Sequence, residues 1–120
     1  MAEHNDLGKL GEDKAVSFLE AKGYEILERN FQFQKAEIDI IAQFENELIV
    51  VEVKTRSSLA FGLPQEFITP SKIKLLVKAI NQYVEIKNSN INIRFDIISV
   101  YKNKTNEFEI EHIENAFYHF

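Results

Sequence analysis

The segment EIDIIAQFENELIVVEVKTR, residues 37–56, contains two apolar runs with charged residues set inside them. The runs are rich in Ile and Val, which predicts β-strands at 36–44 and 47–55. The Glu45-Asn46 pair between them suits a tight turn, so we expect an antiparallel hairpin. LIVV followed by Val53 indicates a central strand covered on both faces. Charges within such a strand need an explanation, because an unpaired buried charge costs several kcal/mol.

The expected register of this hairpin brings carboxylates together. With the turn at Glu45-Asn46, Asp39 faces Glu52 and Glu37 faces Lys54. Directly opposed Cβ atoms lie roughly 4.5–5.5 Å apart, a separation at which two carboxylates repel. A positive charge is therefore expected between them, and Lys54 alone does not balance both.

A divalent cation would meet this need. Mg²⁺ prefers oxygen ligands and is commonly held by one or two carboxylates, waters and a substrate phosphate. We expect Asp39 and Glu52 to bind Mg²⁺, or Mn²⁺ in its place, with the backbone carbonyl of Val53 as a further ligand. Lys54 would contact the attacking water or the scissile phosphate. This set predicts metal-assisted hydrolysis of a phosphodiester. A structural ion-pair cluster and a solvated charged face are the alternatives.

The remaining pattern predicts an α/β domain with a mixed central sheet. The expected elements are a helix capped by Asn5 or Asp6 and ending near Lys22, strands at 24–33, 36–44 and 47–55, a helix capped by Thr69 and ending near Lys87, a strand at 91–101 and a further terminal strand at 108–113. Pro70 in the first turn of the second helix supports its start. The order is αβββαβ plus the terminal strand.

Composition limits the class of protein. The 120 residues are 45% hydrophobic and 28% charged, which predicts a single domain over residues 1–120. The chain has no cysteine, which excludes disulfides and thiolate metal sites. It shows neither a long apolar run nor a signal peptide, so we expect a cytoplasmic protein with no membrane partner. The net charge of −5 argues against nucleic acid as a partner, although a metal site would itself contribute acidic residues.

A carboxylate in one strand followed by Glu-Val-Lys in the next resembles the PD-(D/E)xK signature of the restriction-endonuclease-like nuclease superfamily. The wider pattern is similar to the YraN family, small bacterial proteins of that superfamily. The matching residues are Gly11-Glu12, Arg29-Asn30, EIDIIA, VVEVKTR, Phe61-Gly62, Lys72, Arg94-Phe95-Asp96 and HIENAF. They span nearly the whole chain in order.

The resemblance implies the three-layer restriction-endonuclease-like fold, with a mixed sheet flanked by helices. It implies that Asp39 and Glu52 bind the metal and that Lys54 is the catalytic lysine. Glu12 matches a first-helix Glu that joins the site in archaeal Holliday junction resolvases, and the alternative is that it is one of several acids on an exposed helix face. Ala36 stands where the family usually has Gly, which places the local backbone geometry in question. The implied activity is a Mg²⁺-dependent endonuclease acting on DNA, branched or flapped, in repair or recombination, as a homodimer. RNA is a further candidate substrate.

Other charged residues have two or three possible roles each. Glu37 would support the metal ligands, bind the metal, or pair with Lys54, and the pair is favoured. Arg56 would reach a phosphate or end the strand in solvent. Lys72 and Lys74 give the second helix a basic face that would hold a nucleic-acid backbone or simply face water.

Phe61 and the three histidines are also considered as site residues. Phe61 would stack on a base or pack in the core, and packing is favoured. The three histidines match no zinc spacing and are expected to be structural.

The alternatives to a nuclease are a non-catalytic nucleic-acid-binding or adaptor module that retains the fold, and a structural partner in a protein complex.

Overall fold

The computed structural model describes residues 2–56, 68–87 and 90–117, with side chains from Leu7 onward. Its elements are α1 (Ala2–Ala21), β1 (Glu25–Phe33), β2 (Ala36–Phe44), β3 (Glu47–Arg56), α2 (Pro70–Lys87), β4 (Asn92–Lys102) and β5 (Phe108–Ile113). This is the predicted order, with the terminal strand present. The predicted cap at Asn5 or Asp6 is wrong, because α1 begins at Ala2. Ala and Glu near the start favour helix, so the helix extends beyond the capping signal.

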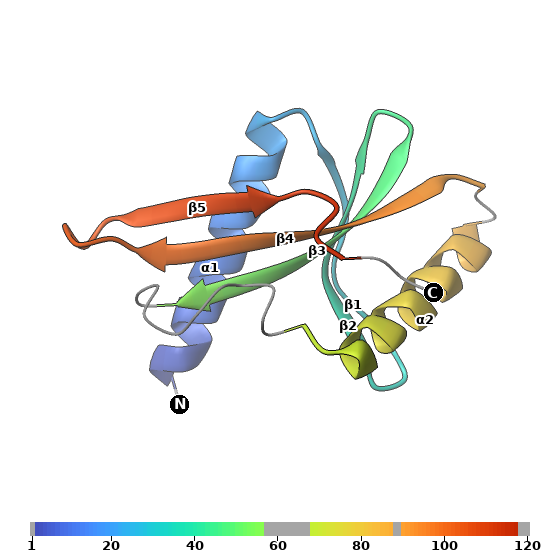
Figure 1. Cartoon of the computed structure of the whole chain (residues 1–120), viewed down its shortest axis with the longest axis horizontal. Coiled ribbons are helices and arrows are strands. Elements are labelled where there is room, and N and C mark those ends of the chain that lie inside the picture. The colour runs from blue at the N-terminus through green and yellow to red at the C-terminus, as the bar shows by residue number, and fades with distance from the viewer. Residues whose placement is uncertain (1, 57–67, 88–89, 118–120) are drawn as a thin grey trace.

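The five strands form one mixed sheet in the order β1-β2-β3-β4-β5. Neighbours pair antiparallel except β3 and β4, which are parallel along the whole length of β3. A parallel pair needs a crossover connection, and the segment containing α2 provides it. β3 therefore lies at the centre of the sheet, and the β4–β5 hairpin projects to one side (Figure 1).

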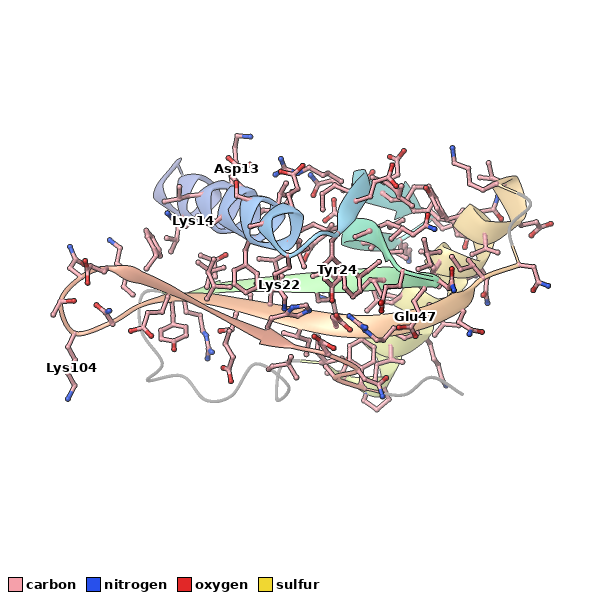
Figure 2. All side chains as sticks on the ribbon, turned by 90° about the horizontal axis from the view of Figure 1, so that it is seen from above. Asp13, Lys14, Lys22, Tyr24, Glu47 and Lys104 are labelled. Carbon is pink, nitrogen blue, oxygen red and sulfur yellow. The ribbon has the colours of Figure 1, made fainter. Side chains whose placement is uncertain are left out.

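Two hydrophobic cores cover the two faces of the sheet and give the predicted three layers. Along β3 the side chains alternate between them: Ile49 and Val51 pack in the core under α1, and Leu48 and Val50 in the core under α2. Figure 2 shows α1 lying over the sheet. Glu52 continues the α2 side of this alternation. The charged end of β3 is thus built onto the face that α2 covers.

Gly11 lets α1 lie close to β3. A Cβ added at Gly11 would come within 2.8 Å of the Cβ of Thr55, closer than packed carbon atoms approach one another. This contact sets α1 over the charged half of β3, and it brings the following residue, Glu12, to the same region.

The start of α2 follows the predicted cap. Thr69 Oγ1 accepts a hydrogen bond of 3.1 Å from the backbone N–H of Lys72, and Pro70 is the first helical residue. Lys72 is thereby held in the first turn. In the part of the chain that the structure describes, no helix combines the length and apolar character needed to cross a bilayer.

Candidate functional site

The site begins where β2 and β3 separate. The ladder between them has the predicted register and ends with the pair Ile40–Val51. Beyond it, the backbone N–H of Val53 donates a hydrogen bond of 2.8 Å to Oδ2 of Asp39. A side-chain oxygen therefore replaces a strand carbonyl as the acceptor, and Asp39 closes the end of the ladder.

Two details of the predicted hairpin are corrected by this separation. Asp39 and Glu52 are not a ladder pair, because pairing has already ended. The favoured ion pair between Glu37 and Lys54 is also wrong. Glu37 is exposed and accepts a hydrogen bond of 3.2 Å from Gln32, its register partner on β1. β2 still pairs with β1 here, whereas its ladder with β3 has ended, so the partner of Glu37 lies on β1.

Asp39 and Glu52 are still electrostatic neighbours. Glu52 lies in the central strand with 2% of its side chain exposed, and Asp39 is partly buried. Burial, and then the negative charge of Glu52, raise the pKa of Asp39 to about 7, although the Val53 N–H acts in the opposite direction. Two carboxylates that repel one another inside the protein favour binding of a cation.

A lysine from α2 supplies part of that positive charge. Lys72 Nζ lies 2.8 Å from Oε1 of Glu52. Burial alone would lower the pKa of Lys72, but the hydrogen bond and charge of Glu52 outweigh it and raise that pKa. Lys54 lies beside Lys72, and burial together with the charge of Lys72 lowers the pKa of Lys54. The site therefore contains Lys72 beside Lys54, whereas the sequence predicted Lys72 as a nucleic-acid contact and not as a partner of Glu52.

Glu12 is held at the edge of the site by β1. Its Oε1 accepts hydrogen bonds of 3.0 Å from Arg29 Nη2 and 3.0 Å from Asn30 Nδ2. Arg29 Nη2 also lies 2.7 Å from Oδ1 of Asp13. The negative charge of Glu12 contributes to the raised pKa of Asp39, so the two carboxylates are close enough to interact electrostatically. The structure thus brings together two of the motifs that carry the family resemblance.

The structure does not place Glu12 among a set of three acidic ligands. Within residues 7–56, 68–87 and 90–117, whose side chains the structure describes, no three His, Asp or Glu side chains are grouped as a metal site would require. A metal role for Glu12 therefore stays a prediction. Val53 remains a candidate through its carbonyl, because the N–H and C=O of a strand residue point to the same edge and its N–H points to Asp39.

The remaining predicted residues lie around this centre or outside it. Arg56 Nη2 is 3.4 Å from Ser99 Oγ on the neighbouring β4. Lys74 is exposed on α2, where a nucleic-acid contact stays a prediction. Phe61 lies outside the described residues.

A pocket of about 380 Å³ opens between β2, β3 and the start of α2. It is lined by Lys35, Ala36, Glu37, Asp39, Glu52, Thr69, Ser71, Lys72, Leu75 and Leu76. The two carboxylates and Lys72 therefore face a shared space that a charged ligand can enter. Glu37, although it does not pair with Lys54, is part of this wall.

Comparison with known proteins identifies the family. The family model of the uncharacterised protein family UPF0102 matches residues 11–100. The chain belongs to the UPF0102 family. UPF0102 proteins of Flavobacterium psychrophilum and Flavobacterium johnsoniae are 67% and 57% identical to it, with all of both chains covered in each comparison. One of Caldicellulosiruptor saccharolyticus is 48% identical over 93% of this chain and 97% of its own. UPF0102 is the YraN family, so the resemblance of the sequence to that family is confirmed.

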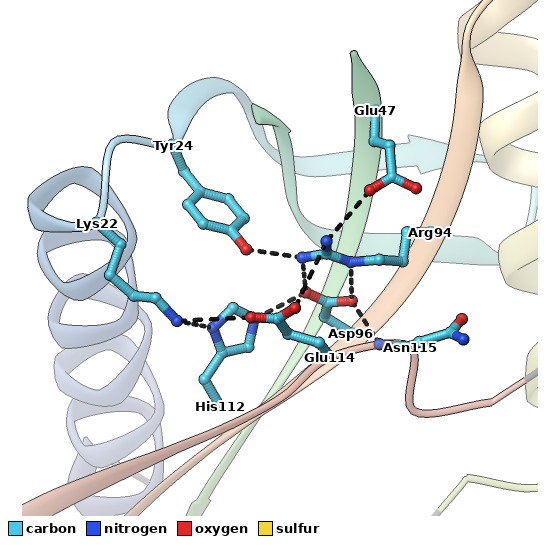
Figure 3. A network of polar contacts seen from close by, with 8 residues as sticks. All are labelled: Lys22, Tyr24, Glu47, Arg94, Asp96, His112, Glu114 and Asn115. Carbon is cyan, nitrogen blue, oxygen red and sulfur yellow. Dashed lines mark hydrogen bonds and ion pairs between the residues drawn. The ribbon is translucent and has the colours of Figure 1, made fainter. Parts of the chain in front are cut away.

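A second polar cluster of this UPF0102 chain was not predicted from the sequence, although Arg94, Asp96 and His112 lie in motifs that carry the family resemblance. It lies on the α1 face of the sheet and is shown in Figure 3. Its members are Lys22, Tyr24, Glu47, Arg94, Asp96, His112, Glu114 and Asn115. Arg94 and Asp96, two apart on one strand, share a face, which was the signal available in the sequence.

Asp96 is the centre of this cluster and is fully buried. It accepts hydrogen bonds from Arg94 Nε and Nη2 at 2.9 and 2.7 Å and from the Asn115 N–H at 3.0 Å. His112 Nε2 lies 2.7 Å from Asp96 Oδ2, and Lys22 Nζ lies 2.7 Å from His112 Nδ1. An ammonium only donates, so Nδ1 accepts and Nε2 carries the proton. The cluster joins β4, β5 and the segment after β5, which is a structural role.

Proposed function

We propose that this protein is a metal-dependent nuclease that hydrolyses phosphodiester bonds in DNA, with branched or flapped DNA as the expected substrate. The observation that carries the proposal is the meeting of Asp39 and Glu52 where β2 and β3 separate, with Lys54 and Lys72 beside them. Acidic residues next to a phosphate oppose binding unless a cation lies between them. A site of this composition therefore fits catalysis better than simple attachment to nucleic acid.

The residues present fit a divalent cation. Oε2 of Glu52 is buried and has no hydrogen-bond partner among the described residues. A buried carboxylate oxygen without a partner is costly, and a metal ion would satisfy it. Burial, and then the charge of Glu52, raise the pKa of Asp39, and a bound cation would favour its charged form. Two carboxylates are enough for Mg²⁺, which keeps several waters and takes further oxygens from a substrate phosphate.

Each residue of the site then has a defined role. Asp39 and Glu52 would hold the cation, and the Val53 N–H fixes the orientation of the Asp39 carboxylate. Lys54, half-buried on the same strand as Glu52, would donate to the phosphate oxygen on which negative charge develops. When bound, the cation would lower the pKa of a water and offset negative charge on the phosphate.

The experiment is a panel of labelled single-stranded, duplex, flapped and four-way DNA, with matched RNA, incubated with Mn²⁺. We expect cleavage by the wild type and a loss of about 100-fold or more in Lys54→Ala. The matched control is Lys104→Ala, because Lys104 lies at the far tip of the β4–β5 hairpin (Figure 2) and its loss should leave cleavage unchanged. Cleavage that persists in Lys54→Ala would be assigned to a contaminant and would reject the proposal.

A non-catalytic nucleic-acid-binding or adaptor module is the second candidate. The net charge of −5 and the pairing of Lys72 with Glu52 favour it, since both reduce the positive charge offered to phosphates. Binding of a branched substrate without cleavage, unaffected by Asp39→Asn, would establish this function. A homodimer is proposed with the nuclease, because two symmetric cuts need two sites, and small-angle scattering would measure it.

A further inference from the structure

Lys72 and Glu52 form an ion pair whose two members differ in their surroundings. The carboxylate of Glu52 is 2% exposed and belongs to the central strand, whereas Lys72 is 36% exposed. The backbone of Lys72 is fixed by the Thr69 cap, and its ammonium reaches Glu52 at the end of a long side chain. A buried carboxylate cannot move to water, whereas a partly exposed lysine can extend its ammonium into solvent.

The two carboxylate oxygens of Glu52 also differ in their contacts. Oε1 contacts Lys72 Nζ at 2.8 Å, and Oε2 is buried without a partner in the described part of the chain. The Lys72 ammonium therefore contacts only one of the two Glu52 oxygens and leaves Oε2 available to a cation. A divalent cation bound to these carboxylates would meet the Lys72 ammonium at the same group, and like charges a few ångströms apart repel strongly in a partly buried site.

From this geometry we infer that Lys72 is an exchangeable counter-ion of the site. Its ammonium holds Glu52 while no divalent cation is bound and withdraws from Oε1 when one binds. The inference rests on the proposed function, since it concerns the same cation. Lys72 is thus a positioning residue that sets the affinity of the site for metal. The withdrawn ammonium would still line the pocket, beside Thr69 and Ser71.

The test is calorimetric titration of the full chain with Mn²⁺ alone, without nucleic acid. Lys72→Met keeps the length and the apolar stem of the side chain but removes the charge, so Mn²⁺ should bind about tenfold more tightly than to the wild type. Lys78→Met is the matched control: Lys78 is exposed on the same helix, and its loss should change the affinity by less than about twofold.

A second variant tests the opposite direction. Lys72→Arg keeps the charge and can bind a carboxylate through two parallel hydrogen bonds. It should compete more strongly for Glu52 and weaken Mn²⁺ binding several-fold. Unfolding of the metal-free protein gives an independent readout, because Lys72→Met should lower its stability and should gain more stability from added Mn²⁺ than the wild type does.

The outcomes separate this inference from the nuclease proposal. If the wild type binds Mn²⁺ but Lys72→Met binds it equally or more weakly, the counter-ion role is rejected and the metal site stands. If Lys72→Met binds Mn²⁺ and the wild type does not, the counter-ion role is supported. If neither protein binds Mn²⁺, both the counter-ion role and the metal-dependent nuclease are rejected. Tighter binding by Lys72→Arg would also contradict the competition.

Discussion

The backbone N–H of Val53 donates a 2.8 Å hydrogen bond to Oδ2 of Asp39 at the point where β2 and β3 part. The strand that carries Glu52 therefore also orients Asp39. Both carboxylates are held by the central part of the sheet and not by loops, which is the arrangement that fixes ligand geometry most firmly. Because the sheet holds the two carboxylates near one another, their charges repel in the metal-free protein. This repulsion leads to the first prediction.

Asp39→Asn should stabilise the metal-free protein at pH 8 by about 1–3 kcal/mol. The pKa of Asp39 is raised to about 7, so the folded state holds this proton more tightly than the unfolded chain does. The stability of the wild type therefore falls as the pH rises from about 4 to about 7. The amide oxygen of Asn still accepts the Val53 hydrogen bond. Urea unfolding at pH 5 and pH 8 measures the effect, and the advantage of the variant should shrink at pH 5.

Glu37→Gln is the control for this prediction, because Glu37 is an exposed acid on the same strand. Its effect on stability should be small at both pH values. An Asp39→Asn effect of equal size at pH 5 and pH 8 would contradict the assigned cause. The nuclease proposal requires that the same variant also lose Mn²⁺ binding.

Gly11→Ala should destabilise the protein by about 1–3 kcal/mol, although Ala is the better helix residue. The added methyl group would meet the side chain of Thr55 and push α1 away from β3. Gly8→Ala in the same helix is the comparison: nothing lies within 4 Å of a Cβ at Gly8, so this variant should gain about 0.5–1 kcal/mol. Thermal or urea unfolding checks both, and equal effects of the two substitutions would refute the close approach.

Asp96→Asn should cost about 3–5 kcal/mol, because it leaves Arg94 and His112 without their buried anion. Burial alone would raise the pKa of Asp96, but the hydrogen bonds from His112 and Arg94 hold it below its usual value. This stabilisation is present above the pKa of the unfolded chain, near 4, and is lost as the pH falls further. Wild-type unfolding curves between pH 2 and 6 should show the loss.

The control for Asp96 is Glu111→Gln, since Glu111 is exposed on the adjacent strand. It should change stability by less than about 0.5 kcal/mol. A comparable loss in both variants would mean that general surface charge, and not the buried cluster, is responsible for the acid sensitivity.

Thr69→Ala should destabilise the protein by about 1 kcal/mol through loss of the cap on α2. It should also loosen the first turn, where Lys72 lies, and so weaken the contact of Lys72 with Glu52. Ser71→Ala, exposed in the same turn, is the control. Urea unfolding measures the first effect. Mn²⁺ calorimetry measures the second, and binding should become modestly tighter.

The sequence predicted most of the fold because its signals are local. The strands at 36–44 and 108–113 have the expected bounds, and the α2 cap lies at Thr69 as expected. The hairpin register was set by the turn at Glu45-Asn46, where Glu45 adopts a positive φ of 55°. Alternation, turn residues and caps act over a few positions, so they can be read without knowing the rest of the chain.

The long-range contacts could not be read in this way. The β2–β3 ladder ends at Ile40–Val51, whereas β2 continues to pair with β1. The expected partner of Glu37 was therefore wrong. Lys72 was expected on a basic helix face that would hold a nucleic-acid backbone or face water. Its contact with Glu52 joins residues 20 apart in the sequence and in different elements, and no local pattern specifies such a contact.

The order of elements, the central position of β3 and the candidacy of Asp39, Glu52 and Lys54 were thus contained in the amino-acid sequence. Which charges meet was settled by packing: α2 brings Lys72 to Glu52, β1 holds Glu12, and β5 brings His112 to Asp96. The physical reason is one of range. Backbone periodicity is a property of neighbouring residues, whereas the energy of a buried charge depends on whichever side chains the folded chain places within a few ångströms of it.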